Sequence, residues 1–399
     1  MNRGASWTES ATRTCRRRRP VVRVLLLEHR GGNLGHDFMA LGVRHIVAHS
    51  FKPAPVVFKS LEQHRPFKVL GRMHPARVLN WFPAGRFPRI KSFIAKSARL
   101  ELLWDSALWV KEFDVAIACG GPNIVAGVWR APDMMLMLHF MHGAITTNGV
   151  PLLNLSNGSC FPWERMQGVA LGPEDIAFWR KALALAAVTT VRDPLAESLL
   201  RIRAGVACPL IACPALNVWG GESVRDGDGR YVVVNFLRRG ANDDWGQGVD
   251  QSRWADAIRT LVQRLRSRHD VLFLCHNLAE FWAAAELCPD VPRALPRSAD
   301  EYLSLVRSAI VGLCCRIHAA VPLASLGVPS IGVGTDSRLL TLETIGIKTF
   351  YVKDATAERL EAELETIIAS GKAERERLRW VRETAIEQYS SIIRAHALA

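Results

Sequence analysis

The sequence predicts an α/β protein with two similar domains that face each other, and three features carry this prediction. From residue 21 onward, short runs rich in Val, Ile and Leu alternate with longer amphipathic stretches, which is typical of βαβ units on a parallel sheet. Glycines and polar residues follow the short runs, at the strand ends where parallel sheets bind ligands. Residues 219–229 are poor in apolar residues and rich in glycine, as expected of a linker between domains.

The first domain is predicted over residues 21–218, behind a basic tail at residues 1–20 that we expect to be disordered. Its predicted strands occupy residues 21–27, 115–119, 151–155 and 188–191. The first strand ends in a glycine-bearing loop, after which apolar residues recur from 38 to 46 at roughly helical spacing. A loop with glycines therefore joins this strand to a helix.

The second domain is predicted over residues 230–350. Short apolar runs at residues 231–236, 271–275, 309–313 and 330–333 predict its strands, and periodic stretches at 254–268 and 298–306 predict helices. The remaining segment, 351–399, is charged and helical in spacing. We expect this segment to return to the first domain and brace it.

Positive charge is concentrated near the start of the chain. The net charge is +13, and the first 100 residues carry 20 Lys and Arg against 4 Asp and Glu. Such a basic region suits nucleic acid, an anionic membrane surface or an anionic substrate. We exclude nucleic acid, because the sequence has neither zinc-finger spacing nor an aromatic-rich RNA-binding strand. Two roles remain for the basic region, namely peripheral contact with an anionic membrane and binding of an anionic substrate.

The sequence predicts a cytoplasmic protein, with peripheral contact at the inner membrane face as one of its roles. The longest apolar stretches, such as 134–150, are broken by polar residues and fall short of the roughly 20 apolar residues that span a bilayer. The arginines at 16–19 precede an apolar segment too short for a secretory signal, while a transit peptide stays an alternative. Nine cysteines show no metal-binding spacing, so we expect buried thiols in a reducing compartment and no metal site.

The most informative motif lies at the end of a predicted strand in the second domain. Arg316 and His318 follow that strand, a helix of small residues comes next, and Gly327-Val-Pro329 leads into another strand. Free backbone N–H groups and the helix dipole favour an anion at such a junction. Arginine offers a planar fork for phosphate or carboxylate, and histidine can exchange a proton near neutral pH.

This stretch resembles the polysaccharide pyruvyltransferase family, whose second half carries Arg-x-His-Ala, a small-residue helix and Gly-x-Pro. Three further stretches agree with the family over residues 21–347, namely Gly32-Asn33-Leu-Gly35, Asp114-Val-Ala-Ile-Ala-Cys-Gly120-Gly121 and Val191-Arg192-Asp193. Two positions depart from the family pattern. His36 stands where the family usually has Asp, with Asp37 one residue later, and Arg338 replaces the usual Lys in Thr335-Asp336-Ser337-Arg338.

The resemblance implies two doubly wound Rossmann-like domains facing a cleft, similar to B-type glycosyltransferases, and phosphoenolpyruvate as donor, with no cofactor and no metal. The acceptor would be a hydroxyl of a glycan or a lipid-linked oligosaccharide. His318 would be the general acid and Asp37, or else Asp114, the base. The residues expected to bind substrate are Arg316, Arg192, Asn33, Gly35, His36, Gly120, Gly121 and Arg338.

Simpler interpretations of these residues stay open. Arg192-Asp193 can be a helix start, His36 and Asp37 can be helix-capping groups, and His276 can be structural or line the acceptor side. A glycosyltransferase that uses a nucleotide sugar is an alternative function, with Glu343 on the ribose. A family member without catalytic activity, binding glycan or membrane, is another.

Overall fold

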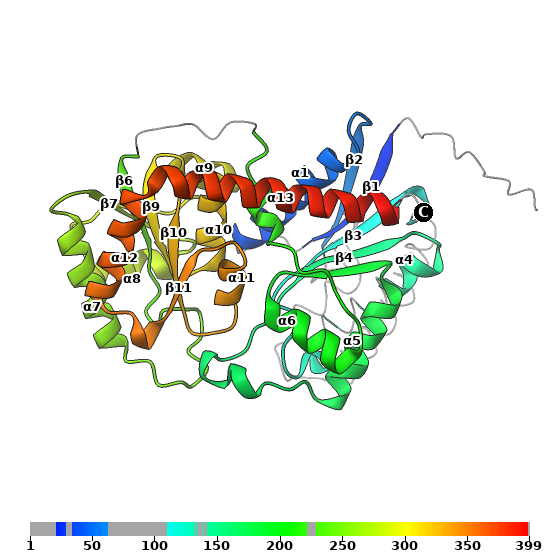
Figure 1. Ribbon diagram of the computed structural model, residues 1–399, viewed down its shortest axis with the longest axis horizontal. Coiled ribbons are helices and arrows are strands. Elements are labelled where there is room, and N and C mark those ends of the chain that lie inside the picture. The colour runs from blue at the N-terminus through cyan, green and yellow to red at the C-terminus, as the bar shows by residue number, and fades with distance from the viewer. Residues whose placement is uncertain are drawn as a thin grey trace, which may run out of the picture.

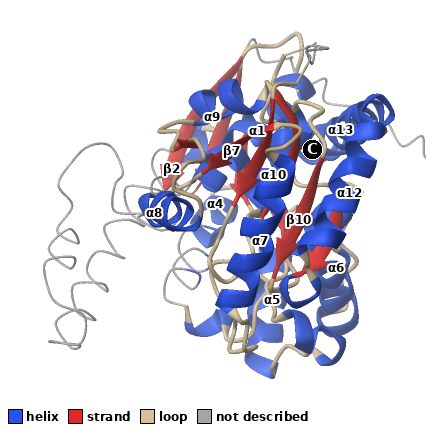
Figure 2. Cartoon of the chain, turned by 90° about the vertical axis from the view of Figure 1, so that its left-hand side faces the viewer, coloured by secondary structure: helices blue, strands red, loops and turns tan. Residues whose placement is uncertain are grey.

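The computed structural model describes residues 21–28, 34–62, 110–131, 134, 138, 142–221 and 229–397 of the chain. The basic tail, Asn33 and most of the predicted linker lie outside these residues. The described part has two parallel β-sheets side by side, with helices on both faces of each (Figures 1 and 2).

The first sheet has five parallel strands in the order β2-β1-β3-β4-β5. They are β1 (Val22–Glu28), β2 (Val56–Glu62), β3 (Val115–Cys119), β4 (Leu152–Asn157) and β5 (Val188–Val191). Helices α1 (Leu34–Ser50), α4 (Gly143–Thr147), α5 (Pro173–Leu185) and α6 (Pro194–Leu199) connect or cover them. The four strands predicted in this region are confirmed, and β2 was not anticipated.

The second sheet has six strands in the order β11-β10-β9-β6-β7-β8. Its strands are β6 (Tyr231–Asn235), β7 (Asp270–Leu274), β8 (Arg293–Ala294), β9 (Ala309–Cys314), β10 (Ser330–Gly334) and β11 (Lys348–Tyr351). Its helices are α7 (Gln251–Leu265), α8 (Leu278–Leu287), α9 (Ala299–Val306), α10 (Ile317–Ser325), α11 (Leu339–Glu343) and α12 (Ala357–Ala369). The predicted strands and both predicted helices are confirmed.

Alternate residues of each buried strand pack against helices on opposite faces of the sheet. In β1, Val24 and Leu26 belong to the apolar cluster of α1, whereas Leu25 and Leu27 belong to the cluster of α5. Strand β6 alternates in the same way between α9 and α10 on one side and α7 and α12 on the other. Because side chains alternate along a strand, consecutive apolar residues in these strands bury both faces of the sheet, and each sheet is doubly wound.

The last helix, α13 (Gly371–Ala397), runs across both sheets (Figure 1). Near its end Ser390 bonds Ser50 of α1 at 3.0 Å, and Glu387 accepts from His49 at 2.9 Å. On the side of the second sheet, Arg382 donates to the Ser325 carbonyl at 2.9 Å. The predicted return of the C-terminal segment to the first domain is therefore confirmed.

Among the described residues, no helix combines the length and apolar composition needed to cross a membrane. The eight cysteines of this part of the chain are buried and unpaired, and burial raises the pKa of the Cys275 thiol to about 12. They act as small apolar side chains.

Gly42 fixes how closely α1 approaches the turn η8 (Pro214–Asn217). A Cβ added there would lie 2.0 Å from the Pro214 carbonyl oxygen, which cannot move like a flexible side chain. We predict that Gly42→Ala lowers the free energy of unfolding by about 3 kcal/mol, because overpacking typically costs about 1–3 kcal/mol. In an isolated helix the same change would stabilise by about 1 kcal/mol.

Urea unfolding of the purified protein measures this effect. Gly168→Ala is the matched control, since nothing lies within 4 Å of its added Cβ. Equal stabilities of the two variants would contradict the packing argument.

Candidate functional site

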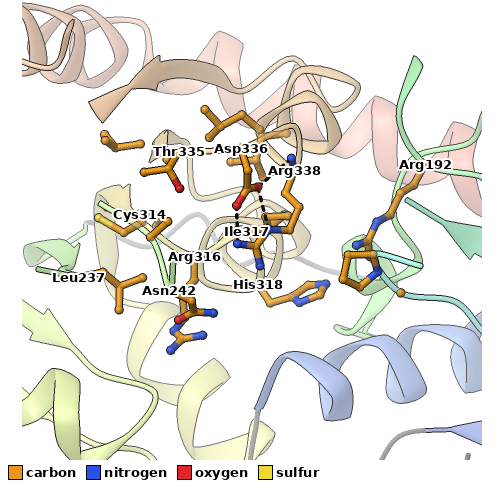
Figure 3. Close-up of a pocket in the computed structure, with 18 of the residues that line it drawn as sticks. Arg192, Leu237, Asn242, Cys314, Arg316, Ile317, His318, Thr335, Asp336 and Arg338 are labelled. Carbon is orange, nitrogen blue, oxygen red and sulfur yellow. Dashed lines mark hydrogen bonds and ion pairs between the residues drawn. The ribbon is translucent and has the colours of Figure 1, made fainter. Parts of the chain in front are cut away.

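A cleft of about 800 Å³, partly open to solvent, lies between the two sheets. The segments that line it follow the carboxyl ends of strands β3, β5, β6, β9 and β10, where parallel α/β sheets bind ligands. The first domain contributes His36, Met39, Gly120, Gly121 and Arg192 to this wall. Figure 3 shows Arg192 on one side of the cleft and Arg316, His318 and Arg338 on the other.

Arg192 is the least neutralised cation of this site. It directly follows β5 and is only 1% exposed. Its Nη1 atom contacts two sulfur atoms, those of Met39 and Cys213, both at 3.9 Å, and its Nε has no hydrogen-bond partner. No carboxylate of the described residues forms an ion pair with it. A buried charge without a partner is costly, so this guanidinium is suited to an anionic ligand.

Asp193, the neighbour of Arg192, forms its hydrogen bonds with other residues. Its carboxylate caps α6 by accepting from the Ala196 N–H at 2.8 Å and also accepts from the N–H and hydroxyl of Ser159. The helix-start interpretation of this pair therefore holds for Asp193, while Arg192 lines the cleft.

Arg316 begins α10 and is paired with a buried acid. Its Nε and Nη2 atoms lie 2.7 and 2.5 Å from Oε1 of Glu280, on α8. Its backbone N–H donates to Asn235 Oδ1 at 3.0 Å. Glu280 also accepts from Asn235 and from the His276 N–H, so Arg316 is held by a network anchored in two other elements.

Arg338 is likewise paired, with Asp336 two residues earlier. Its Nε and Nη2 bond the two carboxylate oxygens at 2.8 and 2.6 Å, which is the bidentate geometry that arginine favours. Asp336 accepts a further hydrogen bond from Trp245 Nε1 at 3.2 Å. These contacts compensate the charge of Arg338 locally.

His318 lies in the first turn of α10, with φ −81° and ψ 15° outside the helical range. Its Nε2 is 3.9 Å from Cys213 Sγ. Burial lowers the pKa of His318 well below its usual value, and the charges of Arg192, His36, His276 and Arg338 add to this effect. The imidazole is therefore neutral at pH 7 in the ligand-free protein.

Two glycines shape the cleft by close packing. A Cβ on Gly35 would lie 2.6 Å from Nδ1 of His318, so this residue lets the imidazole pack against the start of α1. A Cβ on Gly120 would lie 2.2 Å from the Leu155 carbonyl. Gly120 therefore allows a close approach of the backbone to the end of strand β4.

The loop after β4 ties the two sides of the cleft together. Ser159 Oγ lies 2.7 Å from Ser337 Oγ, and the Trp163 N–H donates to the Thr335 carbonyl at 2.9 Å. These contacts join the first sheet to the segment that follows β10. The sequence has no motif that indicates this contact.

The structure separates the predicted site residues into three groups. The cleft is lined by Arg192, Arg316, His318, Arg338, His36, Gly120 and Gly121, and Gly35 touches His318. Asp37 follows His36 in α1 but is not among the lining residues. Asn33 lies outside the described residues.

Several alternatives of the sequence analysis do not reach the cleft. Asp114 precedes β3, at the opposite edge of the sheet, and accepts from the Arg23 N–H at 2.8 Å, so it cannot be the base. Glu343 accepts from the Thr349 hydroxyl and does not line the cleft. His276 is buried against the rings of Phe38 and Tyr302, which is a structural position.

Other lining residues were not anticipated. Met39 lies one helical turn after His36 and shows no chemical motif, and Asn242 lies in the loop after β6. For Asn242, its position after a strand of the second sheet was the one feature of the sequence that could have indicated a place in the cleft. Within the described residues, no group of three or more His, Cys, Asp or Glu side chains could hold a metal ion.

Comparisons with known proteins agree with this architecture. A family model described as polysaccharide pyruvyl transferase matches residues 54–337, a span that includes Arg192, Arg316 and His318 but not Gly35 or Arg338. A search of curated proteins found no match. A UDP-GlcNAc 2-epimerase from Neisseria meningitidis, bound to UDP-GlcNAc, is 11% identical with a TM-score of 0.53, covering 94% of this chain and 98% of its own.

An α,α-trehalose 6-phosphate synthase from Burkholderia multivorans is similar to the same degree. It is 12% identical, with a TM-score of 0.52 and coverage of 94% of this chain and 98% of its own. At such low identity the likeness concerns the fold alone. The predicted fold class, similar to B-type glycosyltransferases, is confirmed.

The buried histidines make stability depend on pH. Burial lowers the pKa of His142 to about 4 and, together with Arg316, that of His276 to about 3, while the pKa of His318 is lowered as well. An unfolded histidine has a pKa near 6.5, so below that pH the unfolded chain binds protons that the folded chain does not. We predict that stability falls as pH drops from about 6.5 to 5, by up to about 1.4 kcal/mol per pH unit for each histidine.

Urea unfolding at pH 7.5, 6.5, 5.75 and 5 measures how the free energy of unfolding changes with pH. These pH values lie above the range in which the titration of carboxylates dominates that change. The variant His276→Phe keeps an aromatic ring between Phe38 and Tyr302 and should show a shallower slope. A free energy of unfolding that does not change over this range would contradict the assignment of neutral buried histidines.

Proposed function

Because the chain belongs to the polysaccharide pyruvyl transferase family, and is therefore a transferase, we propose that it moves the pyruvyl group of phosphoenolpyruvate onto hydroxyls of a glycan. The product is a ketal of the glycan, and phosphate is released. The acceptor is the polysaccharide or its precursor, which can be lipid-linked.

The observation that carries this proposal is the state of Arg192. Three arginines line the cleft, and two of them already have carboxylate partners in Glu280 and Asp336. Arg192 alone among these three contacts only sulfur atoms. Phosphoenolpyruvate offers a phosphate and a carboxylate, and either anion matches the planar fork of a guanidinium.

The start of α10 supplies a second place for the donor. Ile317 and His318, in its first turn, line the cleft beside Arg316, and the N-terminal end of a helix attracts an anion. We propose that Arg192 and this helix end hold the two anionic groups of the donor. Arg316 adds positive charge there while Glu280 fixes its orientation.

His318 is the proposed general acid. Its proton goes to the methylene carbon of the enol, which becomes a methyl group and leaves the central carbon electrophilic. A sugar hydroxyl then adds to that carbon, the C–O bond to phosphate breaks, and a second hydroxyl closes the ketal. His318 is neutral without ligand, and the negative charge of the donor would raise its pKa and allow it to carry this proton.

The attacking hydroxyl must also lose its proton to a base, which we place on the side of the cleft opposite His318. There the first turn of α1 carries His36, which lines the cleft, and Asp37, which follows it. We propose this turn as the acceptor side, with Asp37 as base for a hydroxyl that approaches over the start of α1. The donor is an intracellular metabolite, so the proposed place of action is the cytoplasm, with peripheral contact at the inner membrane face through the basic tail.

The nucleotide-sugar alternative is less well supported. It needs an acid on the ribose, and Glu343 lies outside the cleft lining. Comparing the thermal shift caused by phosphoenolpyruvate with that caused by a panel of nucleotide sugars distinguishes the two functions.

The variant Arg192→Met tests the donor site. We expect at least about 30-fold weaker binding of phosphoenolpyruvate, since truncating one partner of a buried charge pair costs about 2–5 kcal/mol. In the absence of ligand the same variant should unfold less readily, by about 1–4 kcal/mol, because it removes a buried charge that lacks a counter-ion. Calorimetry and urea unfolding measure the two effects.

Arg201→Met is the matched control, because Arg201 is exposed and paired with Glu197 at 3.0 Å. Arg201→Met should change neither the affinity for phosphoenolpyruvate nor the free energy of unfolding by much. An Arg192→Met protein that binds phosphoenolpyruvate as tightly as the parent would refute the assignment.

The variant His318→Gln tests the proton donor. We expect turnover to fall by about 10²–10⁴-fold with little change in the affinity for phosphoenolpyruvate, because a general acid acts mainly in the transition state. Steady-state release of phosphate and calorimetry give the two values. His45→Gln, at an imidazole that contacts the Asn217 carbonyl outside the cleft, is the control, and undiminished turnover in His318→Gln would remove this residue from the mechanism.

A further inference from the structure

Helix α8 presents an exposed apolar stripe beside the cleft. Leu278 is 63% exposed and Trp282 61% exposed, and Glu286, whose side chain is 65% exposed, follows on the same face. Their spacing of four residues places them in one row along the helix. Large apolar side chains in this state are uncommon, because burial of a Trp or Leu side chain is favourable.

Two ion pairs attach α8 to the wall of the cleft. Glu280 binds Arg316, which lines the cleft, and Glu286 bonds Arg238, which follows the lining residue Leu237. The helix also starts just after β7, at the edge of the second sheet where the cleft lies. Glu280 lies on the buried face of α8, opposite Leu278 and Trp282. The stripe reaches the rim of the cleft through its own member Glu286, which bonds Arg238.

The indole of Trp282 stays exposed beside the ring of the preceding residue. The ring of Phe281 meets it edge to face, with centroids 5.6 Å apart and an angle of 87°, and Arg293 lies over the Phe281 ring at 5.5 Å. An exposed indole offers a flat apolar surface to a ligand.

We propose that this stripe is a binding subsite for the polysaccharide acceptor, with Trp282 stacking on a sugar ring outside the cleft. The inference rests on the proposed function and on the position of the cleft. Segments of both sheets wall the cleft, so a polymer bound there must continue over the surface. The apolar face of a sugar packs on an indole, and the charged groups of Arg238 and Glu286 can bond its hydroxyls.

The test compares Trp282→Ala with Trp380→Ala. Trp380 is 65% exposed but lies on α13, so both variants remove an exposed indole. The acceptor probe is the polysaccharide of the host cell after mild acid has removed its pyruvyl ketals, used as the polymer and as its single repeating unit. We expect Trp282→Ala to raise KM for the polymer about tenfold, as loss of an aromatic contact does, with kcat, KM for phosphoenolpyruvate and KM for the repeating unit unchanged.

Affinity electrophoresis in gels that contain the same polymer measures binding without any turnover. If no pyruvyl transfer occurs but the polymer retards the parent and the Trp380→Ala protein more than Trp282→Ala, the subsite stands and the proposed function fails. If transfer occurs and Trp282→Ala behaves like Trp380→Ala in both KM and retardation, the subsite is refuted. A change in sedimentation velocity or in binding to anionic vesicles, with polymer binding unaffected, would also overturn it and assign the stripe to a second copy of the chain or to a membrane.

Discussion

The buried guanidinium of Arg192 is the constraint on which the site depends. A charge placed in the interior without a counter-ion opposes folding, and here the nearest partners of Nη1 are two sulfur atoms, which are weak acceptors. The surrounding strands and helices must stabilise the fold enough to offset this cost. They do so with apolar clusters that cover both faces of each sheet, and Arg192 keeps its charge available to a ligand.

The other charges of the cleft leave Arg192 without an ion pair. Asp193 is the nearest acid in sequence and its charge acts on Arg192, but its carboxylate hydrogen-bonds to α6 and Ser159. Glu280 and Asp336 are each occupied by an arginine of the second domain. Positive charge therefore remains on the side of the first domain, facing His318 across the cleft (Figure 3). A small anion placed between them would interact with a cation and, through its charge, raise the pKa of the imidazole.

Much of this arrangement could be predicted from the sequence, because parallel strands buried on both faces are continuous apolar runs. Strands β3 and β9 are such runs, and the residues directly after them line the cleft. The edge strands β2, β8 and β11 escaped prediction, since β2 (VVFKSLE) and β11 (KTFY) mix polar with apolar residues and β8 has only two residues. The pairing of Arg316 with Glu280 could not be foreseen either, because the two residues lie 36 positions apart in sequence with three further elements between them. Asp37 shows what motif matching leaves open: successive helical residues point about 100° apart, so the one-residue shift from the family pattern places Asp37 beside the lining residue His36 and not among the lining residues.

The fold by itself does not decide which donor is used. At 11–12% identity, an epimerase that binds UDP-GlcNAc and a trehalose 6-phosphate synthase share the two doubly wound sheets with this chain. What distinguishes one site from another on a common fold is the set of side chains at the strand ends. In this chain an arginine without an ion pair follows β5, a neutral histidine starts α10, and a glycine of α1 leaves room for that histidine. The proposed function assigns anion binding to this arginine and proton transfer to this histidine, on opposite sides of one cleft.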